Sequence, residues 1–116
     1  MEVQLRQVLG TIPALQRLQR ERLPAPVAFR LARFLRTLER EARAFESTRT
    51  QILQQLQGGV DDDERRRVIA GLEDLLDETV EIELPHVAVE DLSHIEITTE
   101  DALALEWLLF EGGDGM

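Results

Sequence analysis

The sequence contains no cysteine, and this absence excludes disulfide bonds, thiolate catalysis, iron–sulfur clusters and cysteine-ligated zinc. Lysine, asparagine and tyrosine are missing as well, and all 13 basic residues are arginine. Because the codons for these three residues are AT-rich, the pattern indicates a GC-rich genome. At 116 residues the chain can form one compact domain but not two independent cores. We predict a single domain over residues 1–111 and a flexible, glycine-rich tail over residues 112–116.

Long apolar runs are also missing. No stretch of 18 apolar residues occurs, so no segment has the composition of a membrane-spanning helix. The first ten residues, MEVQLRQVLG, carry acidic and basic side chains where a signal peptide needs an uninterrupted apolar segment. We therefore expect a protein that makes no membrane contact and works inside a cell or in a particle assembled there.

Residues that carry chemistry are few and poorly placed for it. The two histidines, His86 and His94, are eight residues apart, which fits neither a helical nor a hairpin pair of zinc ligands. Neither serine, Ser47 or Ser93, lies in a glycine elbow. The pair Gly58-Gly59 precedes acidic residues that would repel a phosphate. These patterns predict a non-enzymatic protein without a metal, a cofactor or a small-molecule substrate.

The strongest positive signal is a helical pattern from Pro24 to Gln57. Its apolar residues recur every three or four positions, and such a seam marks where a second helix lies. A helix over residues 25–57 would be roughly 50 Å long at 1.5 Å per residue, longer than most globules of this size are wide. We therefore expect part of it to project or to pack against another chain. The seam consists of Leu31, Leu35, Leu38, Ala42, Phe45, Ile52 and Leu56, with Arg49 in place of an apolar residue.

Arg49 leaves two interpretations open. Its stem can pack in the seam while the guanidinium reaches water or a local glutamate. Alternatively, it pairs with an acid of the carboxyl-terminal half or of another subunit and so determines the register of the contact. The stripe is broad before Ala42 and narrow after it. We therefore predict that the first half of this helix belongs to the core and the second half binds a partner.

The helix before the long one has two candidate starts. The run Gly10-Thr11-Ile12-Pro13 favours a start there, with Thr11 as the cap and Pro13 in the first turn, and an end near Glu21. If the helix instead runs from Gln4 through Pro13, it must kink at the proline.

A third helix and short strands follow the long helix. The run Asp61–Glu64 predicts a helix start, because acids in the first turn complement the helix dipole. From Val80 the apolar period changes to two. That period predicts strands at 80–84 and 87–89 which, with residues 2–5, form a small two- or three-stranded sheet.

The last helix is predicted over residues 101–110, where Thr98 and Asp101 approximate a capping box. It is apolar on most sides, so it is either buried centrally or docks on a neighbour. The predicted fold class is mainly α (α+β), a helical hairpin with one long helix, a third helix, the small β element and this carboxyl-terminal helix. The residues we predict to bind a partner are Phe45, Arg49, Ile52, Leu56, Trp107, Leu108 and Phe110.

The net charge of −10 is divided unequally along the chain. Residues 1–57 hold ten arginines against five acids, net +5, and residues 58–116 hold three arginines against eighteen acids, net −15. The acidic half can fold over the basic helices of its own subunit or pack head to tail on another. Nucleic acid is a less favoured partner, because glutamates alternate with the arginines of the long helix and no aromatic is placed for stacking.

Five segments spread along the chain carry a family resemblance. They are Ile12–Gln16 with Leu18, Leu23–Ala25 leading into Arg30–Ala32, Phe45-Glu46 with Arg49, Leu75–Glu81, and Ala104–Trp107. Together they resemble small uncharacterised proteins encoded by tailed phages and prophages. The resemblance implies a viral origin, a location in the host cytoplasm during infection or in the virion, and other phage proteins or further copies of the chain as partners. It carries over no catalytic residues.

Two functions follow from these observations. The first is a non-enzymatic phage structural or assembly protein that acts through helix-mediated protein–protein contacts. The alternative is a small acidic inhibitor or regulator whose −15 half binds a host protein and imitates nucleic acid.

Overall fold

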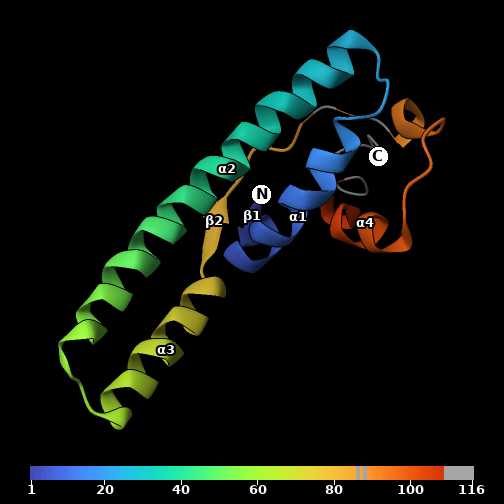
Figure 1. Ribbon diagram of the computed structural model, residues 1–116. Coiled ribbons are helices and arrows are strands. Elements are labelled where there is room, and N and C mark those ends of the chain that lie inside the picture. The colour runs from blue at the N-terminus through green and yellow to red at the C-terminus, as the bar shows by residue number, and fades with distance from the viewer. Residues whose placement is uncertain (86, 88, 109–116) are drawn as a thin grey trace.

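The computed structural model describes residues 1–85, 87 and 89–108. Helix α1 lies beside the first half of the long helix α2, and α3 returns along the second half (Figure 1). The predicted mainly α fold, with one long helix and a small antiparallel sheet, is confirmed. The elements are β1 (Glu2–Gln4), α1 (Leu5–Leu18), α2 (Ala25–Gln54), the 3₁₀ helix η1 (Gln55–Gly58), α3 (Asp62–Leu76), β2 (Thr79–Glu81), the 3₁₀ helix η2 (Val89–Leu92) and α4 (Thr99–Ala104).

Helix α1 begins at Leu5, so the start predicted near Thr11 is wrong and the longer alternative is correct. Gln4 and Gln7 cap this end reciprocally, and the backbone N–H of Gln4 donates to the Gln7 side chain at 3.1 Å. Thr11 lies inside the helix and donates to the carbonyl of Gln7 at 2.7 Å. Pro13 is tolerated in the helix interior although its missing N–H removes one bond of the ladder.

The small sheet pairs the beginning of the chain with residues 79–81. Strands β1 and β2 are antiparallel, with Val3 opposite Val80. A strand was predicted over 87–89, and the structure describes residues 87 and 89 of it. The prediction is wrong for both, because residue 87 lies in no strand and residue 89 begins η2. Pro85 cannot donate to a ladder, and it is buried together with Val87 instead of extending β2. Residues 2–4 therefore provide the partner strand.

A tight turn joins α2 to α3, and the helix start predicted at Asp61–Glu64 is confirmed. Gly59 has φ 84°, the left-handed conformation that glycine adopts without a steric penalty. The Asp61 side chain then accepts the backbone N–H of Glu64 at 2.8 Å, which caps α3. This sharp reversal sends α3 back along α2 (Figure 1).

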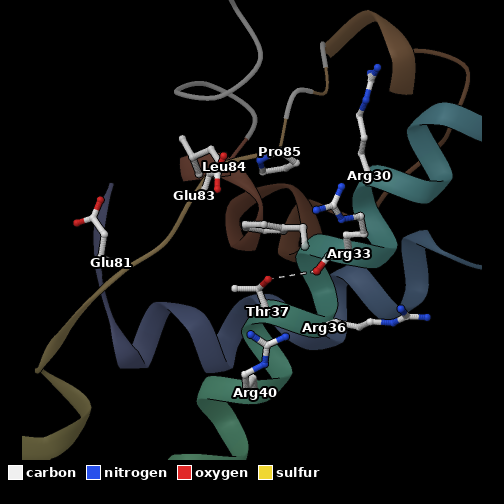
Figure 2. Close-up of a pocket in the computed structure, with 10 residues that line it drawn as sticks. Arg30, Arg33, Arg36, Thr37, Arg40, Glu81, Glu83, Leu84 and Pro85 are labelled. Atoms are coloured by element: carbon white, nitrogen blue, oxygen red, sulfur yellow. Dashed lines mark hydrogen bonds between the residues drawn. The ribbon is translucent and has the colours of Figure 1, made fainter.

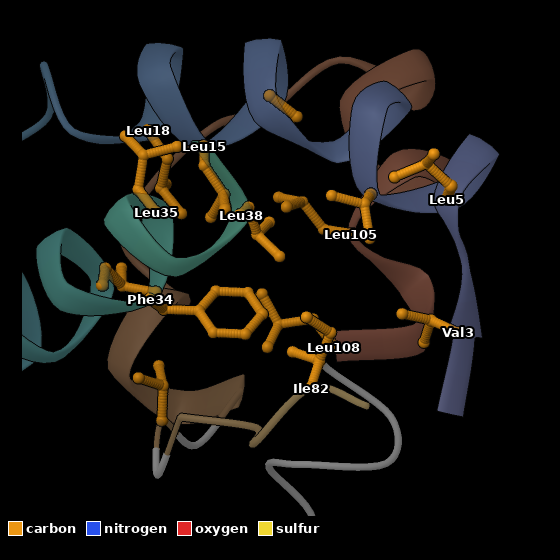
Figure 3. Packing of buried hydrophobic residues seen from close by; sticks show 14 of the residues in the cluster. Val3, Leu5, Leu15, Leu18, Phe34, Leu35, Leu38, Ile82, Leu105 and Leu108 are labelled. Atoms are coloured by element: carbon orange, nitrogen blue, oxygen red, sulfur yellow. The ribbon is translucent and has the colours of Figure 1, made fainter. Parts of the chain in front are cut away.

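The hydrophobic core lies on the first half of α2. Leu15 of α1 and Leu38 of α2 are both fully buried, and Phe34 packs among them with Ile82 and Leu105 (Figure 3). Along α2 the last buried residue is Phe45. The core therefore covers α2 from Val27 to about Phe45, and its remaining turns lie outside.

A buried polar contact joins α1 to the segment after α4. Thr11 is 1% exposed, and its hydroxyl accepts the indole N–H of Trp107 at 2.9 Å. The same oxygen lies 3.1 Å from the carbonyl of Ala104. The ring of Trp107 is 5.9 Å from that of Phe34, centroid to centroid, so the indole is held by a hydrogen bond at one edge and by ring packing.

We predict that Thr11→Val lowers the free energy of unfolding by about 1–2 kcal/mol, because it leaves the indole N–H of Trp107 without its acceptor. Urea unfolding followed by the fluorescence of Trp107, the single tryptophan, measures the change. Thr37→Val is the matched control, since among the described residues the Thr37 hydroxyl donates only to the local Arg33 carbonyl. Equal effects of the two substitutions would contradict a tertiary role for Thr11.

Candidate interaction surfaces

The second half of α2, η1 and α3 form a two-helix arm, which we define as residues 46–76. The arm extends away from α1 and α4 (Figure 1). Every residue from 46 to 76 is described, and none of them is buried. The chain measures 54 × 27 × 24 Å and has a radius of gyration of 17.3 Å, whereas a compact domain of this length has roughly 13 Å. The arm is the source of this elongation.

Apolar side chains in the arm are at most half-buried, and of these Leu75 and Leu76 pack against the core. Leu53, Val68 and Leu72 are half-buried between the two helices, and Ile69 is 48% exposed. Two helices cannot enclose an apolar stripe, because such a stripe needs a neighbour on each side to be removed from water. Near the turn Leu53, Leu56 and Ile69 line an open groove together with the side chain of Arg65.

The residues predicted to bind a partner from α2 are in or next to this arm. Phe45 is 9% exposed and lies where the arm joins the core. Ile52 and Leu56 are half-buried within the arm. Arg49 is exposed, and its guanidinium lies 3.6 Å from the carboxylate of Glu46. This contact matches the interpretation in which Arg49 reaches a local glutamate.

The residues predicted to bind a partner after α4 have a different location. Leu108 is 3% exposed, and Trp107 bonds to Thr11 as described above, so both pack against their own chain. This location agrees with the alternative of central burial, because Leu105 and Leu108 belong to the core. Docking on a neighbour stays a prediction. Phe110 lies outside the described residues.

The groove also contains three residues that the sequence pattern did not indicate, namely Leu53, Ile69 and Arg65. Ile69 belongs to an apolar face of α3 that also contains Val68, Leu72, Leu75 and Leu76. The adjacent pair Val68-Ile69 was the available signal, because two neighbouring apolar residues on a helix point about 100° apart. Val68 is half-buried, whereas Ile69 is 48% exposed and lines the groove.

A second surface lies between α2 and the segment that follows β2. Arg30, Arg33 and Arg40 line one wall of an open groove, and Glu81 and Glu83 stand on the other (Figure 2). The Arg36 side chain points away from residues 81–85 (Figure 2). An anion that enters this groove meets carboxylates as well as guanidinium groups, so the groove does not have the uniform positive potential that attracts a phosphate chain.

The predicted attraction between the two halves of the chain is visible within one subunit. Arg6 contacts Asp77 at 3.2 Å, and the Nε of Arg17 donates to both carboxylate oxygens of Asp101 at 2.9 and 3.1 Å. The hydrogen bonds from Arg17 hold the pKa of the Asp101 carboxyl below its usual value, and burial partly opposes this shift. The same bonds raise the pKa of Arg17. This ion pair ties α4 to the end of α1.

In comparisons with known proteins, no family model, curated protein or solved structure matches the chain. Over the part of the chain that the structure describes, no helix combines the length and apolar character needed to cross a membrane.

We predict that Asp101→Asn lowers the free energy of unfolding at pH 7. The difference between the variant and the wild type should become smaller as the pH falls below about 4. The folded-state pKa of Asp101 is lowered, so its ionisation favours the folded state above its ordinary pKa near 3.8, and this contribution disappears as the carboxyl protonates. The urea midpoints of the wild type and the variant at pH 7 and pH 3 measure this contribution to stability. Glu106→Gln, at an exposed position, is the control and should show no such convergence.

Proposed function

We propose that the chain is a non-enzymatic structural or assembly protein of a tailed phage, and that its arm binds other proteins through helix-mediated contacts. The phage setting is supported by the resemblance of the sequence. The mode of action is supported by one observation: the arm contains a continuous set of apolar side chains, and none of its residues is buried.

The physical argument starts from the exposed apolar area. Covering such area stabilises a complex by roughly 25 cal/mol for each Å² removed from water. In a helical bundle, a third or fourth helix covers what two helices leave open. The groove lined by Leu53, Leu56 and Ile69 occupies this position in the arm. A partner helix seated there completes a bundle and leaves the core undisturbed.

The geometry also suits docking without refolding. The arm joins the core through Phe45, which is buried, and through β2, which is paired with β1. Both ends of the arm are thus held in place. A partner therefore meets a pre-formed surface and does not bear the entropic cost of ordering it.

Inhibition through an acidic surface is the weaker proposal. Carboxylates of the acidic half are engaged within the chain, since Asp77 pairs with Arg6, Glu81 with the amino terminus, and Asp101 with Arg17. Asp61 caps α3. Each of these contacts removes negative charge from a surface that would have to imitate nucleic acid.

We predict that Leu56→Glu leaves the core folded and lowers incorporation of the protein into phage particles or assembly intermediates at least tenfold, because a charge then enters an apolar contact. Mass spectrometry of purified particles and intermediates measures incorporation, and Trp107 fluorescence reports folding. Leu103→Glu is the matched control, since Leu103 is 65% exposed on α4 and distant from the arm. Wild-type protein missing from both particles and intermediates would contradict the proposal.

A further inference from the structure

Three residues of α3 form a charged and apolar stripe beside the groove of the arm. Arg65, Ile69 and Glu73 are four residues apart, so they lie on one side of the helix; we call them the α3 stripe. Ile69 is 48% exposed, and both flanking residues are exposed. Among the ion pairs of the described residues, neither Arg65 nor Glu73 takes part in one.

The stripe is complementary to itself. A twofold axis through Ile69 places a second α3 antiparallel to the first. Ile69 then meets its own copy, and Arg65 meets Glu73 of the partner subunit, because both lie one turn from the axis in opposite directions. Such a contact is isologous: both subunits use the same surface and the contact closes at two copies. A parallel arrangement would instead place like charges together.

The exposed area of the chain is sufficient for such a contact. A compact monomer of this mass exposes roughly 6,400 Å². This chain exposes 8021 Å². The excess of roughly 1,600 Å² exceeds the roughly 800 Å² that a standard interface takes from each partner. Within the arm, Leu53 and Leu56 line the groove beside the stripe.

We propose that the chain forms a symmetric homodimer in which the α3 stripes of two copies pack antiparallel, with Ile69 at the axis and reciprocal ion pairs between Arg65 and Glu73 of the partner subunit. This inference rests on the proposed function, because it names a second copy of the chain as the partner of the arm. Leu53 and Leu56 flank the axis, so the contact also covers the apolar groove.

Sedimentation velocity of the purified full-length chain over a hundredfold concentration range tests the dimer. We expect a concentration-dependent dimer. Arg65→Glu and Glu73→Arg should each weaken dimerisation roughly tenfold, because two attractive pairs become repulsive. Neither substitution opposes helix formation, since a glutamate near the start of α3 and an arginine near its end both complement the helix dipole.

Two further measurements separate contact between subunits from an effect within one. An equimolar mixture of Arg65→Glu and Glu73→Arg proteins should form a heterodimer with near wild-type affinity, because every pair is again opposite in charge. The double variant Arg65→Glu/Glu73→Arg should recover the homodimer for the same reason. Arg67→Glu is the control; it makes the same charge change on the opposite side of α3 and should leave the affinity within about twofold.

A wild-type chain that stays monomeric over the whole range would overturn the inference, and so would equal weakening by Arg67→Glu or a mixture that fails to pair. Particle analysis keeps this failure distinct from failure of the proposed function. A monomer incorporated into particles contradicts only the dimer. A dimer that is missing from particles and intermediates contradicts only the assembly role.

Discussion

Helix α2 has 30 residues and is roughly 45 Å long, and its apolar side chains must be buried along this length. The rest of the chain packs a full core against only part of it. Helix α1, the small sheet and the segment after α4 surround α2 as far as Phe45, and from there only α3 accompanies it. The elongated shape, the absence of buried residues in the arm and the open groove all follow from this mismatch. A two-helix arm cannot remove its own apolar stripe from water.

The core depends on contacts between distant parts of the chain. Residues 2–4 pair with 79–81, Thr11 bonds to Trp107, and Arg17 bonds to Asp101. These contacts bring the acidic half over α1 and cover the side of the core that α2 leaves open. Hydrogen bonds and ion pairs are directional, so they also determine the position and orientation of α4. Apolar packing alone would restrict that position less. Exposed large apolar residues remain in the arm, at Ile69, and also elsewhere, at Phe29, Ile97 and Leu103.

Local signals predicted the elements that local physics controls. The apolar period of α2 and the helix start at Asp61 depend on residues near one another, and both agree with the structure. Predictions failed where a distant segment decided the outcome. Thr11 resembled a helix cap but lies inside α1, because Gln4 and Gln7 cap it earlier and Trp107 uses the hydroxyl. Of the two segments expected to join residues 80–84 in a sheet, residues 2–4 pair with β2, whereas residue 87 lies in no strand.

The candidate site shows the same division. By itself, the sequence determined that the second half of the long helix carries a narrow apolar stripe with Arg49 in it, since helical periodicity is a property of the residues alone. Which apolar residues stay exposed was decided by tertiary structure. Leu108 belongs to the core and Trp107 packs against it, whereas Ile69 is 48% exposed in the groove although its neighbour Val68 is half-buried. Exposure depends on what the rest of the chain places beside a side chain, and no local pattern contains that information.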